Sequence, residues 1–219
     1  MTVPLESLAF AIGIKPALRL RLDGPDAARE ELEWLRRGAA VVRGPSGLLY
    51  VARDAAQARA IERAEASILP AGPPRSPGAG VCTAHRELGR LLGYPSCCVE
   101  AFVGRVVRGV DVLDDGSRAT ELVVAVAAAL SRSRRRLAHL NFTLPDRRAL
   151  LPFDPCAFDC PYAARYARAL FDAYLERQEA EARALLSELG RPVRLTRAGE
   201  RLHPDDPAEA FLSVEFDEP

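Results

Sequence analysis

Residues 92–102 read Leu92-Gly93-Tyr94-Pro95-Ser96-Cys97-Cys98-Val99-Glu100-Ala101-Phe102. A second segment, residues 153–161, reads Phe153-Asp154-Pro155-Cys156-Ala157-Phe158-Asp159-Cys160-Pro161. The chain has five cysteines, and these two segments hold four of them. Proline beside each cysteine pair is typical of a helix start, so both pairs are predicted at the first turn of a helix. We expect the two segments to meet in the fold and to bind a metal through their thiolates.

The spacing of the second pair favours thiolate chemistry. Cys156 and Cys160 are four residues apart, so a helical turn opened by Pro155 would place their sulfurs on one face. Cys160 directly precedes Pro161, which predicts a position near a helix N-cap, where the helix dipole lowers the pKa of a thiol. A Cys-Pro step at the last ligand is typical of iron–sulfur cluster segments.

The first pair influences the choice of metal. Cys97 and Cys98 are adjacent, so their side chains point in different directions, which suits a cubane better than one small tetrahedral ion. Structural zinc usually binds Cys-x2-Cys knuckles, and neither pair has that spacing. The pattern therefore favours an iron–sulfur cluster of the 4Fe–4S type, with zinc as the alternative. A redox or cluster-dependent enzyme is one of the functions that such a cluster would allow.

Three other interpretations stay open at this stage. A zinc ion held by the same four cysteines would make the chain a stapled binding or interaction module. A metal-free dithiol pair would make it a thiol redox protein. Buried cysteines also pack as small apolar side chains, with no further role. Cys82 lies outside both pairs, and we expect it to be a bystander.

At these residues the sequence resembles a family of uncharacterised prokaryotic proteins, a domain of unknown function. Its marks are a Leu-Gly-Tyr-Pro-x-Cys-Cys-x3-Phe segment and a later Pro-Cys-x3-Cys segment, which here are residues 92–102 and 155–160. The similarity covers residues 83–169. It implies a shared metal or cluster site at Cys97, Cys98, Cys156 and Cys160, and it brings no established reaction with it.

Three further residues are weak candidates for catalysis. Glu100 and Asp159 each neighbour a cysteine segment and could act as an acid or base, and His139 lies between the two segments. Each also has a structural interpretation, which for Asp159 is favourable charge at a helix start. The sequence has no Ser-His-Asp order, no His-Glu-x-x-His and no nucleotide-binding glycine loop. Whether the chain is an enzyme is left open.

The predicted fold is of the α+β class, with a small N-terminal α+β domain at 1–69, a Pro/Gly linker at 70–80, and a mostly helical cysteine-containing domain at 81–219 that ends in a short strand pair. Helix 27–37 is expected to pack through Leu32 and Leu35, with Trp34 beside them. Asp54 is expected to cap helix 55–66, and Thr83 to cap helix 83–92. The predicted strands are 17–22, 39–43, 48–52, 193–196 and 211–216. The remaining predicted helices are 96–110, 120–137 and 161–189.

Composition limits the partners. The 219 residues include 30 basic and 30 acidic ones, so no overall field draws the chain to nucleic acid or to an anionic membrane. Only the arginines at 132–136 form a basic patch. No apolar run reaches the roughly 20 residues of a membrane span, and the N-terminus does not resemble a secretion signal. We expect a cytoplasmic protein with an unidentified small-molecule or protein partner, in a compartment that keeps thiols reduced.

Overall fold

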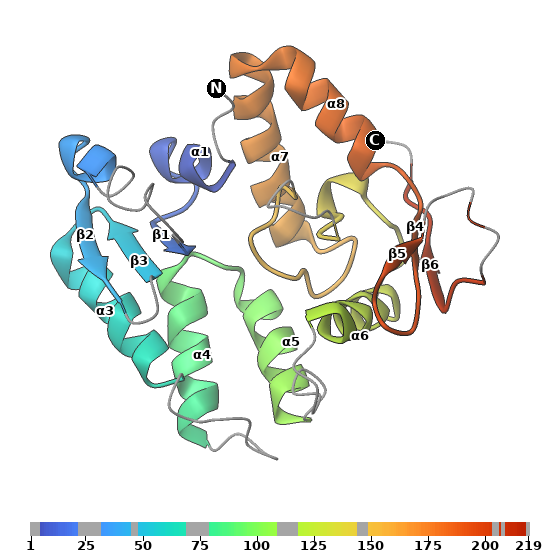
Figure 1. The fold of residues 1–219 in the computed structure, drawn as a ribbon, viewed down its shortest axis with the longest axis horizontal. Coiled ribbons are helices and arrows are strands. Elements are labelled where there is room, and N and C mark those ends of the chain that lie inside the picture. Colours follow the sequence, from blue (N-terminus) through green and yellow to red (C-terminus); the bar gives the residue numbers. More distant parts are fainter. Residues whose placement is uncertain are drawn as a thin grey trace.

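The computed structural model describes residues 5–21, 32–44, 48–68, 79–108, 118–143, 149–202, 206 and 209–217. Within these ranges helices make up the bulk of the fold, and two small antiparallel sheets lie on opposite sides of them (Figure 1). The α+β class predicted from the sequence is therefore confirmed. None of the described helices is both long enough and apolar enough to span a membrane.

The first sheet has the strand order β1-β3-β2. Its strands are β1 (Ala17–Arg21), β2 (Ala40–Arg43) and β3 (Leu48–Ala52), and both outer strands run antiparallel to β3. Side chains alternate between the two faces of a strand. Tyr50 therefore packs towards helix α3 (Ala55–Ala66), and Val51 packs on the other face. The predicted strands 39–43 and 48–52 pair as β2 and β3. Helix 55–66 is confirmed with its cap, because the Asp54 carboxylate accepts a hydrogen bond from the Gln57 N–H.

The second face of this sheet is covered differently from the prediction. Leu32 and Leu35 were expected to anchor a helix over 27–37, but they are 46% and 48% exposed. Residues 32–36 are helical, whereas 22–31 lie outside the described residues. Trp34 is buried as expected, and its ring meets that of Phe10 edge-to-face, at 5.4 Å between ring centroids. Phe10 belongs to α1 (Leu5–Ala11), a helix that the sequence patterns did not indicate.

Helices α4 (Ala79–Leu91) and α5 (Ser96–Val107) form a hairpin around Gly93. The predicted cap at Thr83 is wrong, because α4 begins at Ala79 and the Thr83 hydroxyl donates to the Ala79 carbonyl inside the helix, at 3.0 Å. The last two residues of the predicted linker are thus helical, and 69–78 lie outside the described residues. The position of the domain boundary stays a prediction.

Gly93 closes this hairpin in a backbone conformation that only glycine adopts easily. Its φ is +77°, and an added Cβ would lie 2.4 Å from Cδ of Pro16. Gly38 has the same φ, +77°, but nothing lies within 4 Å of its Cβ position. A left-handed conformation costs a non-glycine residue about 1–2 kcal/mol, and overpacking adds about 1–3 kcal/mol.

We therefore expect Gly38→Ala to lower the free energy of unfolding by about 1–2 kcal/mol, because it carries only the left-handed cost. Gly93→Ala should lower it by about 1–3 kcal/mol more, because Pro16 must also move. Urea denaturation of the two variants and the wild type measures both values. Equal losses would show that the Pro16 contact carries no energetic weight.

Two long predicted helices end earlier than expected. Helix α6 spans Arg118–Leu130 and not 120–137, because the hydroxyls of Ser131 and Ser133 bind the carbonyls of the last turn. The basic residues at 132–136 therefore lie after the helix. The single helix predicted over 161–189 is two helices, α7 (Pro161–Arg177) and α8 (Glu179–Leu189), joined at Gln178, whose φ of −145° is not helical. The break lets Ala182, Leu185 and Leu189 fold back onto the core.

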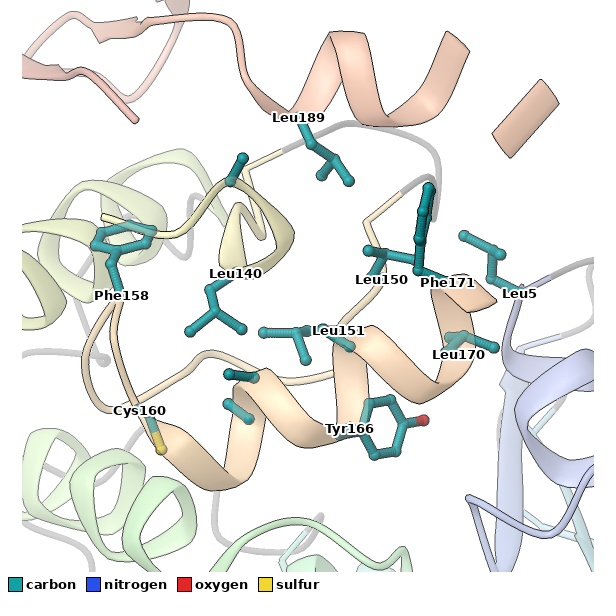
Figure 2. Packing of buried hydrophobic residues seen from close by; sticks show 14 of the residues in the cluster. Leu5, Leu140, Leu150, Leu151, Phe158, Cys160, Tyr166, Leu170, Phe171 and Leu189 are labelled. Atoms are coloured by element: carbon teal, nitrogen blue, oxygen red, sulfur yellow. The ribbon is translucent and has the colours of Figure 1, made fainter. Parts of the chain in front are cut away.

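The second sheet has the order β5-β4-β6, from β4 (Val193–Leu195), β5 (Arg201–Leu202) and β6 (Leu212–Val214). The predicted C-terminal strand pair is confirmed, with β5 as an addition. This sheet, α1, α6, α7 and α8 share the main apolar core. Figure 2 shows Leu5 of α1 beside Leu170 of α7, whereas Cys160 lies at the start of α7, with Phe158 on the segment that leads into it.

Candidate metal centre and the adjoining cavity

Two helix starts from distant parts of the chain converge at the cysteines. Cys97 and Cys98 lie in the first turn of α5, directly after its N-cap Pro95. Cys160 is the N-cap of α7, and Pro161 occupies the first helical position, where a missing N–H costs nothing. Cys156 lies in the loop just before it. Both helix dipoles therefore direct their positive ends towards the sulfurs, which favours thiolates.

The four sulfurs form one compact group. The Sγ atom of Cys160 lies 3.6 Å from that of Cys97 and 3.9 Å from that of Cys98. The Sγ atoms of Cys97 and Cys98 are 3.9 Å apart, and all four sulfurs, including that of Cys156, lie within 4.8 Å of one another. The predicted meeting of the two cysteine segments is thus observed, and the group could hold a metal ion. Among the described residues it is the only set of this kind.

Proton sharing among the thiols makes one of them acidic. A hydrogen bond from the Cys98 thiol lowers the pKa of Cys160 to about 5. The same bond raises the pKa of Cys98, and burial of the thiol raises it further. The pKa of Cys156 is raised to about 12, mainly by burial. Because a metal binds thiolates, its binding must release the remaining protons, and its affinity should fall at low pH.

The loop that carries Cys156 is held by hydrogen bonds to other elements. The Cys156 N–H donates to Sγ of Cys98 at 3.4 Å. The Phe158 N–H donates to the Ser133 hydroxyl at 2.6 Å, and the Phe158 carbonyl accepts from the Leu137 N–H at 3.0 Å. These bonds hold the loop against the segment that follows α6. The same bonds fix the positions of the two cysteines that flank Phe158.

A cavity of about 500 Å³ opens beside the sulfurs. Its wall combines β1, the end of α3, helices α4 and α5, and the loop after residue 150, and Cys98 is part of that wall. The full lining is Arg19, Glu65, Ile68, His85, Leu88, Gly89, Leu92, Tyr94, Cys98, Val99, Phe102, Pro152, Phe153 and Asp154. The sulfur group is thus in contact, through Cys98, with a space large enough for an organic molecule.

Two ion pairs stand in or behind the cavity wall. The Arg19 guanidinium binds both carboxylate oxygens of the buried Glu65. Arg105, whose side chain is 2% exposed, donates to Oδ2 of Asp154 at 2.7 Å. Burial raises the pKa of Asp154, and Arg105 opposes that shift. The Asp154 side chain is 36% exposed and is among the residues that line the cavity.

His85 and Phe102 form the neighbouring part of the wall. Their rings meet edge-to-face, with centroids 5.1 Å apart. Burial lowers the pKa of His85, so the imidazole is neutral at physiological pH. Phe102 also lies beneath the Arg105 guanidinium, at 5.6 Å from the ring centroid.

The three weak catalytic candidates lie elsewhere. Glu100 is exposed and pairs with Arg86 through bonds of 2.7 and 2.9 Å. Asp159 accepts the backbone N–H groups of Arg134 and Arg135, which holds the turn after α6. His139 packs edge-to-face on Phe171, at 5.2 Å. None of the three is among the residues that line the cavity.

Cys82 packs with Val99 and Val103 in a separate small cluster, apart from the four sulfurs. Asp154, which lines the cavity, was not among the candidates from the sequence. Its position two residues before Cys156 could have indicated it as a site residue. Arg19 and Glu65 carry no comparable signal. They reach the cavity because β1 and α3 pack beside the α4–α5 hairpin.

No family model, no curated protein and no solved structure matches the chain. The resemblance through the two cysteine segments therefore stays a prediction. The assignment of a function depends on the geometry of the site.

Proposed function

We propose that the chain is a metalloprotein whose four cysteines hold a single tetrahedral ion, and that this ion is zinc. The observation that carries the proposal is the sulfur spacing of 3.6 to 3.9 Å at Cys97, Cys98 and Cys160. A tetrahedral ion with metal–sulfur bonds of about 2.3 Å separates its ligands by about 3.8 Å. The distances among these three sulfurs agree with that value, and the Cys156 sulfur lies within 4.8 Å of them.

The same spacing supports zinc over the 4Fe–4S cluster that the cysteine pattern favours. A cubane binds each of its four cysteines through a different iron, so its thiolates stand farther apart than those around one ion. The adjacency of Cys97 and Cys98 suggested that a cubane would suit them better than one small ion, yet the first turn of α5 brings their sulfurs within 3.9 Å of each other. Four thiolates also complete the coordination of zinc.

A closed site of this kind joins parts of the chain that are far apart in sequence. It would fasten the start of α5 to the start of α7 and to the loop between residues 149 and 160, and so hold one side of the cavity. Such a site has no open position for a reacting water, which supports a binding module over a metal-dependent enzyme. Reduced thiolates fit the cytoplasm expected from the sequence.

Metal analysis tests the proposal directly. The protein is purified without oxygen, zinc, iron and acid-labile sulfide are measured per chain, and the visible spectrum is recorded. One zinc per chain with no colour is the expected result. Iron and sulfide at about four each per chain, with a broad brown absorption, would overturn zinc in favour of the cubane. One iron without sulfide would keep the single-ion site and overturn the identity of the metal.

Cobalt substitution tests the geometry independently of the native metal. Co²⁺ bound in a tetrahedral thiolate site should show intense visible bands, and zinc should displace them. A protein that folds without any metal, and takes up neither ion, would leave thiol exchange or plain packing as the role of the cysteines.

A further inference from the structure

We propose that the cavity beside Cys98 binds a small organic ammonium ion that carries a flat apolar group. The charge argument below rests on the proposed metal centre, whereas the shape and the anchoring carboxylate do not. The volume, about 500 Å³, lies within the range of small-molecule sites. The lining mixes apolar side chains with a few charged groups, which is the usual composition of such sites.

Aromatic rings form the part of the wall suited to a cation. Tyr94 and Phe153 lie together, with ring centroids 4.9 Å apart, and Phe102 lines the same cavity. Two of these rings already attract internal cations. Lys15, the only lysine in the chain, lies 5.4 Å from the Tyr94 centroid, and Arg105 lies 5.6 Å from that of Phe102. Ring faces in a desolvated wall favour an ammonium group over a neutral or anionic one.

The charges around the cavity leave a negative balance. Arg19 pairs with Glu65, and Asp154 pairs with Arg105. Lys15, beside the Tyr94 ring, pairs with Glu6. A divalent ion with four thiolates carries a net charge of about −2, and one of those thiolates, Cys98, is part of the wall. A cation would offset this charge, whereas an anion would add to it.

Asp154 provides the specific contact. Its Oδ2 atom accepts the bond from Arg105, and among the described residues no hydrogen bond to Oδ1 is recorded. Among the described residues, Arg19 carries the only guanidinium that lines the cavity, and Glu65 already binds it at two nitrogens. The wall therefore offers an acceptor to a ligand, while its cation is engaged.

Three probes of one shape and different charge test the inference. Phenethylamine, 2-phenylethanol and 3-phenylpropionate share a phenyl ring on a two-carbon chain. Isothermal titration of each into the full metal-loaded chain should show phenethylamine binding at least tenfold more tightly than the alcohol, with the acid weakest. Equal affinity for amine and alcohol, or preference for the acid, would overturn the inference.

Variants locate the site. Asp154→Asn should weaken phenethylamine by roughly tenfold or more and leave the alcohol nearly unchanged, because only a charge-assisted bond is lost. Asp172→Asn, on the exposed face of α7, is the matched control and should bind as the wild type does. Phe153→Leu, which removes one ring, should weaken the amine more than the alcohol. An Asp154→Asn protein that binds the amine as the wild type does would contradict the assignment.

Metal content is measured on every sample, which separates this inference from the proposed function. If zinc is bound but the amine is not preferred, the proposed metal centre is supported and the proposed ligand is contradicted. Amine preference that depends on Asp154 in a protein without metal supports the ligand assignment and removes the metal centre.

Discussion

Cys160→Ser is expected to abolish tight metal binding and to lower the melting temperature markedly. Cys160 is the N-cap of α7, and its sulfur lies 3.6 and 3.9 Å from those of Cys97 and Cys98, so its loss removes one of four ligands. An ion at about a thousandfold above its dissociation constant stabilises the fold by about 4 kcal/mol. For a chain of this length that corresponds to a loss of about 8–16 °C. Thermal unfolding and metal analysis measure the two effects.

Cys82→Ser is the matched control for this prediction. Cys82 is buried with Val99 and Val103 and takes no part in the sulfur group, so this variant should keep a full complement of metal. A strong chelator should lower the melting temperature of the wild type and of Cys82→Ser, but should leave that of Cys160→Ser nearly unchanged. Equal metal content in Cys160→Ser and the wild type would show that the sulfur group does not hold the ion.

Phe158→Ala is expected to lower the free energy of unfolding by about 3–5 kcal/mol, the usual cost of removing a buried phenylalanine. Phe158 is fully buried in the main core, edge-to-face with Phe216 at 5.4 Å and stacked on Phe142 at 5.7 Å. Figure 2 shows the ring in the core on the segment that leads into Cys160. Urea denaturation of the metal-free proteins separates this packing loss from any change in metal affinity.

Phe211→Ala provides the comparison, because that ring is 53% exposed and its recorded ring contact is with Arg197. We expect it to cost less than about 1 kcal/mol. Equal stability of the two alanine variants would contradict this prediction. It would show that burial of the Phe158 ring contributes no more to stability than the exposed ring of Phe211.

Local patterns in the sequence were sufficient for the elements that local bonds define. The alternation of leucine and arginine from residue 17 predicted β1, Asp54 predicted the start of α3, and Pro161 predicted the start of α7. Each of these signals depends on residues within one turn or one strand. The same is true of the cysteine segments, whose residue types and flanking prolines marked four candidate ligands that the fold does bring together.

The errors occurred where packing over a distance decided the outcome. The helix break at Gln178 has no proline or glycine to signal it. The break is stabilised by packing at a distance, because it lets Ala182, Leu185 and Leu189 of α8 be buried in the main core. Leu32 and Leu35 have helical spacing but face solvent, because Trp34 is the side chain that reaches the Phe10 ring.

The sequence by itself thus determined which residues can bind a metal, because cysteine type and helix-start position are local properties. Only the tertiary structure decided how far apart the sulfurs stand, because that distance depends on the angle at which the starts of α5 and α7 meet over the core. The cavity was likewise decided by tertiary structure. Its charged residues, Arg19, Glu65 and Asp154, come from three separate elements, and no pattern within one segment records that they will face each other.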